Sequence, residues 1–203
     1  PIERITPDIQ AKIDDLKETM INAHNPEGVG LSFPQIGYSL RGFVTYLDKK
    51  MRVYLNPTLL DISEEQTLGG TKDRPTLEGC LSIPWLYGPV WRPKKIKIKA
   101  IDEHGAEVVK TFSSFPARLF MHEFDHLEGV LFTDYTLRDS LPLYLLNKEQ
   151  VYRDPGPQHS DQVVITVSYL TTSTHTISPS PGSGLSLLSY NIPSLSDRTT
   201  TLP

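Results

Sequence analysis

The stretch that decides the fold runs from Phe115 to Gly129 and reads FPARLFMHEFDHLEG. Ser113 or Ser114, just before it, is a suitable helix N-cap, because a serine oxygen can accept a bond from the first turn. Pro116 suits that turn, where no backbone donor is needed, and Gly129 suits the left-handed position after the last turn. These residues predict one helix with defined ends.

The centre of this stretch is His122-Glu123-Phe124-Asp125-His126. Residues four apart lie on one face of a helix, so His122 and His126 can present two imidazoles to one point, with Glu123 beside them. This H-E-x-x-H pattern is typical of metal hydrolases, in which the histidines bind the metal and the carboxylate moves protons. The alternative is a solvated helix that happens to carry two of the chain's six histidines. We favour the metal site.

The segments before the helix predict an α+β fold. Ile9, Ile13, Leu16 and Met20 recur at helical spacing, which predicts an N-terminal helix from Asp8 to about His24 with Thr6 as its cap. Strands are expected at 41–47, 52–60, 95–102 and 107–112, with an exposed loop at 61–75. Asn56-Pro57 interrupts the second strand, which disfavours a central, uninterrupted position for it in the sheet. Mostly antiparallel β-sheets should then pack around a central helix that carries the H-E-x-x-H pattern.

The C-terminal part gives a weaker signal. Residues 137–152 predict a short helix broken by Pro142. From Asp154 the chain is rich in Ser, Thr, Pro and Gly, with one apolar run at 163–167 that can add a strand. We therefore expect one domain over residues 1–153 and an otherwise flexible extension over residues 154–203.

Composition excludes several classes of protein. The net charge is −4 and there is no basic patch, which argues against specific nucleic-acid binding. No apolar run approaches the length of a membrane span. The single cysteine cannot form an internal disulfide, which favours a reducing compartment. The chain starts at Pro1, so we expect the natural N-terminus, with any targeting sequence, to be missing.

Two further segments carry groups suited to chemistry. The glycines of residues 28–37 predict a loop that lets another backbone approach closely, and the neutral amide of Gln35 can donate to an oxyanion. A phosphate-binding loop is excluded, since no Lys-Ser/Thr pair follows. Cys80 stands between glycine and leucine, and on this segment alone it is more simply a small buried residue than a thiolate ligand.

Taken together, three segments resemble the signature motifs of the peptide deformylase family. They are Gly28-Val29-Gly30-Leu31-x-x-Pro34-Gln35-Ile36-Gly37, then Glu78-Gly79-Cys80-Leu81-Ser82, then His122-Glu123-x-x-His126. The resemblance covers roughly residues 6–139. It implies a hydrolase that removes the N-formyl group from the initiator methionine of nascent polypeptides and releases formate.

The resemblance also implies roles for individual residues. Cys80, His122 and His126 would hold one divalent metal, natively Fe(II), with Zn, Ni or Co possible in the isolated protein. Glu123 would transfer the proton, and Gln35 with the backbone N–H of Leu81 would stabilise the oxyanion. The remaining expectation is that Gly28, Val29, Gly30, Ser32, Phe33, Glu78, Gly79, Tyr87 and Leu119 lie along the substrate, and that Arg92 pairs with Glu78.

The chain departs from the family at Ser32 and Phe33, where two alanines are usual, so we expect Phe33 to narrow the approach to the metal. Two alternatives stay open. One is a zinc peptidase whose third ligand is Glu128 or Glu149, and the other is a non-catalytic protein that binds formylated chains. Expected partners are nascent formylmethionyl peptides, with transient ribosome contact; a monomer is expected, although a dimer is not excluded. The Ser/Thr/Pro-rich extension suggests a mitochondrial or other organellar enzyme, the other option being bacterial-type cytoplasm.

Overall fold

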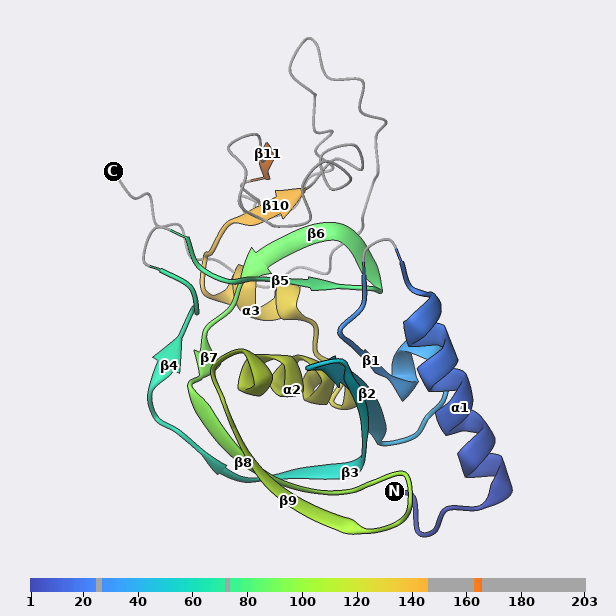
Figure 1. The fold of residues 1–203 in the computed structure, drawn as a ribbon. Helices are drawn as coiled ribbons and strands as arrows, with labels where there is room; N and C mark the ends of the chain where they lie inside the picture. Colours follow the sequence, from blue (N-terminus) through green and yellow to red (C-terminus); the bar gives the residue numbers. More distant parts are fainter. Residues whose placement is uncertain (25–26, 72–73, 146–162, 166–203) are drawn as a thin grey trace. The chain divides into compact units, whose positions relative to one another are not determined.

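The computed structural model describes residues 1–24, 27–71, 74–145 and 163–165 (Figure 1). All of them belong to one compact unit, Pro1–Thr166. None of the helices in these ranges is long and apolar enough to cross a membrane. The helical elements are α1 (Pro7–Asn22), the 3-10 turn η1 (Phe33–Ile36), α2 (Ser114–Leu127) and α3 (Phe132–Arg138). The strands are β1 (Gly30–Ser32), β2 (Gly42–Leu47), β3 (Lys50–Ile62), β4 (Gln66–Thr67), β5 (Leu77–Cys80), β6 (Ile83–Pro89), β7 (Arg92–Pro93), β8 (Lys95–Ile101), β9 (Glu107–Ser113), β10 (Leu143–Leu145) and β11 (Val163–Ile165).

The strands form antiparallel sheets, as the sequence predicts. The largest has the order β1-β2-β3-β8-β9, a second has the order β11-β10-β6-β5, and β4 pairs with β7. Every pairing between neighbouring strands in these sheets is antiparallel. Strand β8 alternates as expected, with Ile96, Ile98 and Ala100 buried and the intervening lysines exposed. Strands β1 and β5 each lie at one edge of their sheet.

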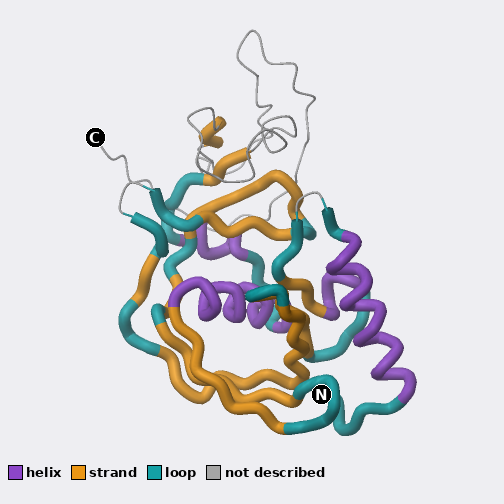
Figure 2. The backbone as a smooth tube through the Cα atoms, in the orientation of Figure 1, coloured by secondary structure: helices purple, strands orange, loops and turns teal. Residues whose placement is uncertain are grey.

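Helix α2 lies within the curve of the five-stranded sheet (Figures 1 and 2). Its apolar face buries Ala117 and Phe120. The Phe120 ring lies 4.9 Å from that of Phe43 and 5.4 Å from that of Tyr54, in edge-to-face contacts that favour one helix orientation. The helix ends near Gly129, whose φ of 72° places it in the predicted left-handed conformation. Arg118, His122 and Asp125, at spacings of four and three, share another face of the helix and are also buried.

Helix α1 closes the other side of the sheet. The Ile9 amide donates to Thr6 Oγ1 over 3.2 Å, so the predicted cap forms, and Pro7 lies in the first turn. Ile13, Leu16 and Met20 are buried in one cluster with residues of β1, η1 and β3. This packing anchors the segment that carries β1 and η1.

The strand that carries Asn56 is central in the sheet but is interrupted at this residue, as the Asn56-Pro57 pair predicts. Strand β3 is the middle strand of five, and the interruption is absorbed as a bulge, with a register shift between Leu55 and Thr58 against β8. Asn56 adopts a φ of 46°, and its side chain accepts from the Ile2 N–H over 2.8 Å and donates to the Ile2 carbonyl over 2.6 Å. The Asn56 side chain therefore anchors the N-terminal segment at the bulge, while the Asn56 backbone N–H donates to the Arg41 carbonyl over 2.8 Å.

Three local expectations need correction. The loop expected at 28–37 contains β1 and η1, and the loop expected at 61–75 contains the end of β3 and β4. No helix starts at residue 137 among the described residues; instead, α3 begins at Phe132 and ends at Arg138, and residues 143–145 form β10. At the start of α3 the Asp134 carboxylate accepts from the Leu131 N–H over 2.8 Å. The rest of that expected helix, and the extension apart from the short strand β11, lie outside the described residues.

Candidate metal centre

Three potential metal ligands from two separate elements meet beside α2. Cys80 ends β5, while His122 and His126 project from one face of the helix. Their ligand atoms lie within 4.8 Å of one another, and Cys80 Sγ is 3.3 Å from His126 Nε2. All three residues are buried. A thiolate and two imidazoles within this distance form a donor set suited to a divalent transition metal.

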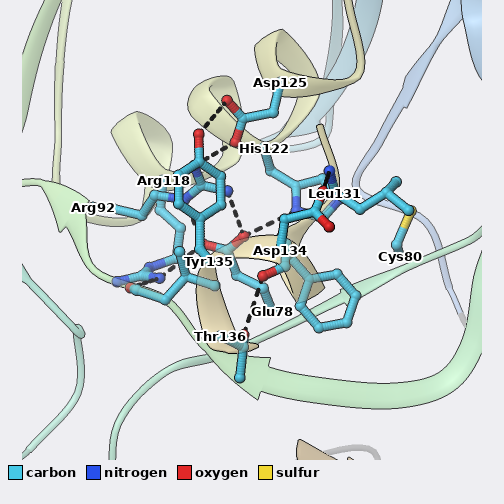
Figure 3. Close-up of polar contacts among 12 residues, drawn as sticks. Glu78, Cys80, Arg92, Arg118, His122, Asp125, Leu131, Asp134, Tyr135 and Thr136 are labelled. Carbon is cyan, nitrogen blue, oxygen red and sulfur yellow. Dashed lines mark hydrogen bonds and ion pairs between the residues drawn. The ribbon is translucent and has the colours of Figure 1, made fainter. Parts of the chain in front are cut away.

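The carboxylate of Glu78 sets the orientation of His122. Its Oε2 accepts from His122 Nδ1 over 3.0 Å, which leaves Nε2 of the ring for a metal. Arg92 holds the same carboxylate with two parallel bonds, from Nε to Oε1 over 2.9 Å and from Nη2 to Oε2 over 2.8 Å. The expected bidentate pair is therefore present, and it supports a ligand histidine (Figure 3).

Two charged residues of this network are missing from the sequence prediction. Arg118 donates from Nη1 to Glu78 Oε1 and to the Val90 carbonyl, each over 2.8 Å. Asp125 accepts from Arg92 Nη1 over 2.5 Å and from the Tyr135 hydroxyl over 3.1 Å. A signal for both is their helical spacing, since Arg118 and Asp125 lie four residues before and three residues after His122, on the same face.

The network also sets the charges at the centre. Burial opposes ionisation of Glu78, but its bonds to Arg92 and His122 outweigh burial and hold the pKa well below its usual range. Burial likewise raises the pKa of the Cys80 thiol, while bonds from His122 and His126 bring it down to about 5. Cys80 is therefore a thiolate near neutral pH, the form that binds metals.

Glu123 lies beside the ligands with its carboxylate in an unusual environment. It is 2% exposed, and its Oε2 has no hydrogen-bond partner among the described residues. Burial raises its pKa to about 7 against the opposing effect of the two histidines. A carboxylate with this pKa can accept and release a proton near neutral pH. Its Oε1 lies so close to Gly30 that a Cβ there would be only 2.3 Å away.

Gln35 faces the centre from η1. Its side-chain oxygen, Oε1, accepts from the Ser32 N–H over 2.8 Å. Because a backbone N–H can only donate, this bond identifies the oxygen of the amide and leaves the Nε2 group at the opposite side. Nε2 donates to Cys80 Sγ over 3.4 Å and to Ser82 Oγ over 3.1 Å. The amide donor of Gln35 is therefore directed toward the ligand cluster.

A cleft of about 200 Å³ opens onto this centre between β1 and β5. It has room for a few side-chain or backbone groups of a ligand. Its lining also includes the apolar residues Phe115, Trp85 and Leu86, which no sequence motif predicts. The predicted site residues that do line it are Gly28, Val29, Gly30, Gln35, Glu78, Gly79, Cys80, Leu81, Tyr87, Leu119, His122 and Glu123.

The expectation that Ser32 and Phe33 contact the substrate is wrong, because both are fully buried and neither lines the cleft. Phe33 packs in the apolar cluster under α1, with its ring 6.2 Å from that of Tyr38, so it does not narrow the approach to the ligands. Glu78 also differs from expectation: its oxygens bond to Arg92, Arg118 and His122, so we assign it to the support of His122 and not to substrate contact.

Neither alternative ligand for a peptidase-type site is found beside the two histidines in the part of the chain that the structure describes. Glu128 is at the surface in an ion pair with Arg41, with 2.7 Å between Nη2 and Oε1. Glu149 lies outside the described residues. Within the part of the chain that the structure describes, Cys80 is the third member of the ligand group. The thiolate, two imidazoles, and an adjacent buried oxygen without a partner together fit a bound divalent metal.

Comparison with known proteins agrees with this geometry. A family model described as polypeptide deformylase matches residues 1–140. The peptide deformylase of Pseudothermotoga lettingae is 42% identical over 133 residues, which cover 66% of this chain and 71% of the relative. Peptide deformylase 1 of Clostridium perfringens is 45% identical over 137 residues, which cover 66% of this chain and 88% of the relative.

Solved structures give the same result. The crystal structure of peptide deformylase from Thermotoga maritima matches with a TM-score of 0.58 and 35% identity, over 66% of this chain and 85% of that chain. The peptide deformylase from Synechococcus elongatus, in complex with actinonin, matches with a TM-score of 0.58 and 29% identity, over 75% of this chain and 73% of that chain.

Proposed function

The chain belongs to the polypeptide deformylase family, and from that premise we propose how its own residues remove the N-formyl group from nascent polypeptides. Enzymes of this family use one divalent metal. We propose that Cys80, His122 and His126 hold it here, with Fe(II) as the native ion and Zn, Ni or Co as replacements. The observation that carries this proposal is the convergence of their three ligand atoms within 4.8 Å beside Glu123. A divalent metal bound there supplies Lewis acidity, which makes water a nucleophile near neutral pH.

Glu123 is the proton carrier in this proposal. Its carboxylate accepts a proton from the water that attacks the formyl carbon, and it delivers that proton to the methionine nitrogen as the C–N bond breaks. The products are formate and a free α-amine. Support comes from its burial, its pKa of about 7, and the unpartnered Oε2.

Gln35 stabilises the negative charge that develops on the formyl oxygen. Its Nε2 is directed toward Cys80 Sγ at 3.4 Å, so a carbonyl oxygen entering beside the ligands can take a bond from it. The Leu81 N–H, in the residue after Cys80, is the second proposed donor. Gly30 leaves the space that the Glu123 carboxylate occupies.

The two sheet edges that line the cleft suit a peptide substrate. Strands β1 and β5 are both edge strands, and each has backbone groups not used in pairing with its neighbour. A peptide in an extended conformation can add to such an edge through its own backbone, independently of its sequence. An enzyme that acts on many nascent chains needs this kind of recognition. We propose that the apolar residues Leu119 and Phe115, which line the cleft, contact the methionine side chain.

Formate release from formyl-Met-Ala-Ser by protein loaded anaerobically with Fe(II) tests the proposal. We expect activity in the wild type, a loss of at least about a hundredfold in Glu123→Gln, and little change in Glu128→Gln, a matched variant at the surface of the same region. Metal analysis of each sample separates loss of metal from loss of proton transfer. Equal activity of Glu123→Gln and the wild type at equal metal content would overturn the assignment of Glu123.

A further inference from the structure

The hydroxyl group of Ser32 has a defined contact that the proposed reaction does not use. Ser32 ends β1 and is fully buried, and its Oγ lies 2.8 Å from Gln35 Oε1. A glutamine Oε1 can only accept hydrogen bonds, so the serine hydroxyl must donate. The Ser32 backbone N–H donates to the same oxygen over 2.8 Å. Both lone pairs of Gln35 Oε1 are therefore occupied by one residue.

This arrangement fixes the direction of the other end of the amide. With Oε1 held on Ser32, the Nε2 group must point away from it, toward Cys80 Sγ and Ser82 Oγ. The Ser32 N–H bond is also half of a capping box at the start of η1, so the glutamine rotamer is coupled to the backbone of the turn. Rotation of the carboxamide would leave the Ser32 N–H and hydroxyl facing an NH2 group.

The second bond also changes the strength of the donor. Hydrogen bonds in a chain polarise one another, by roughly 10–30% per bond, and a carboxamide that accepts two bonds at oxygen has a more acidic N–H. The effect is largest where water is excluded, as at the buried Ser32. A stronger and better directed N–H group stabilises a developing oxyanion more than it stabilises a neutral carbonyl group.

We infer that Ser32 is a positioning residue for Gln35, whose hydroxyl orients and polarises the amide that donates to the formyl oxygen. The inference rests on the proposed role of Gln35. Ser32 lies outside the cleft lining and so does not touch the substrate. It acts through the glutamine. Its effect should appear in the transition state and hence in kcat, with little effect on KM.

Ser32→Ala is the direct test, because it removes one oxygen and leaves the backbone N–H bond to Gln35 Oε1 in place. We expect kcat for formyl-Met-Ala-Ser to fall about 5-fold in the Fe(II)-loaded protein, with KM changed less than about twofold. Ser39→Ala, an exposed serine in the segment after η1, is the matched control and should keep the wild-type kcat. In a Gln35→Ala background, Ser32→Ala should change kcat by less than about 1.5-fold, because the group it acts through is gone.

A spectroscopic measurement tests the contact without relying on activity. In nitrogen-15 spectra of the Zn(II)-loaded protein, the Gln35 side-chain NH2 pair is identified by its loss in Gln35→Ala. We expect Ser32→Ala to move this proton pair upfield, since the polarising bond is lost, and Ser39→Ala to leave it in place. An unmoved pair in Ser32→Ala would overturn the inference.

The roles of Gln35 and Ser32 are distinguished by different outcomes. A Gln35→Ala variant with wild-type kcat would refute the role of Gln35 itself. A Gln35→Ala variant that loses activity, beside a Ser32→Ala variant with unchanged kcat, would refute only the role of Ser32.

Discussion

Replacing Gly30 with alanine should displace the proposed proton carrier without changing any reacting group. A Cβ at this position would lie 2.3 Å from Glu123 Oε1, 2.8 Å from its Cδ and 2.9 Å from its Cγ. Real Cβ contacts stay beyond 3.0 Å, so the oxygen must move by at least 3.0 − 2.3 = 0.7 Å. Glu123 is 2% exposed and lines the cleft, so the displaced carboxylate must move toward the packed residues behind it or into the cleft, away from its position in the structure.

The expected cost follows from that displacement. A shift approaching 1 Å in a catalytic group costs up to about a hundredfold in rate, so we expect kcat for Gly30→Ala to fall about 10- to 100-fold. Overpacking should also lower the free energy of unfolding by about 1–3 kcal/mol. Formate release, metal content and urea unfolding measured on the same preparation separate these effects. Metal content should stay near that of the wild type, because no ligand residue is contacted.

Gly28→Ala is the matched comparison. Its Cβ would lie 2.9 Å from the end of the Leu81 side chain, a flexible group that can move aside, and at ordinary contact distances from Met20 (3.7 Å) and Ala23 (3.8 Å). We expect a loss of less than about fivefold in kcat. If Gly30→Ala kept more than half of the wild-type kcat with full metal content, the close packing of Gly30 against Glu123 would not limit catalysis, and the reasoning would be refuted.

Three further predictions concern the support of the site and the core. Arg92→Lys loses the two parallel bonds to Glu78, so metal affinity should fall about 10- to 100-fold, as measured in competition with a chelator. Unchanged metal affinity would argue against a role of the Arg92–Glu78 pair in orienting His122. Phe33→Ala should cost about 3–5 kcal/mol in urea unfolding, because the ring is fully buried, while KM of the folded fraction stays within about twofold; a large fall in KM would instead indicate that Phe33 obstructs the cleft. Asn56→Ala removes both bonds to the Ile2 backbone and places alanine at a φ of 46°, so the free energy of unfolding should fall by about 2–3 kcal/mol with kcat unaffected. An unchanged free energy of unfolding in urea would contradict the stabilising role of Asn56 at the bulge.

The elements best predicted from the sequence are those whose signal is local. Helical spacing predicts α1 and α2 to within a few residues, and strict alternation predicts β8 with its partner β9. Thr6 forms the predicted cap of α1, whereas Ser113 precedes α2 without the expected side-chain bond to the first turn. The sequence is least informative where a residue that usually interrupts a strand is accommodated by contacts with distant residues. Asn56 is typical of an edge strand or a turn, yet its strand lies in the middle of the sheet, with a register shift at this point and with the Asn56 side chain bonded to the distant Ile2 backbone.

The sequence by itself determined that His122 and His126 share a helix face with Glu123, since helical geometry relates residues four apart, and three ordered motifs indicated the family. Only the tertiary structure decided that Cys80 lies 3.3 Å from His126 and that Phe33 points into the core rather than the cleft. Spacing along one element is encoded in a few adjacent residues. Contact between elements depends on strand register and side-chain packing across the whole sheet, which no short motif specifies.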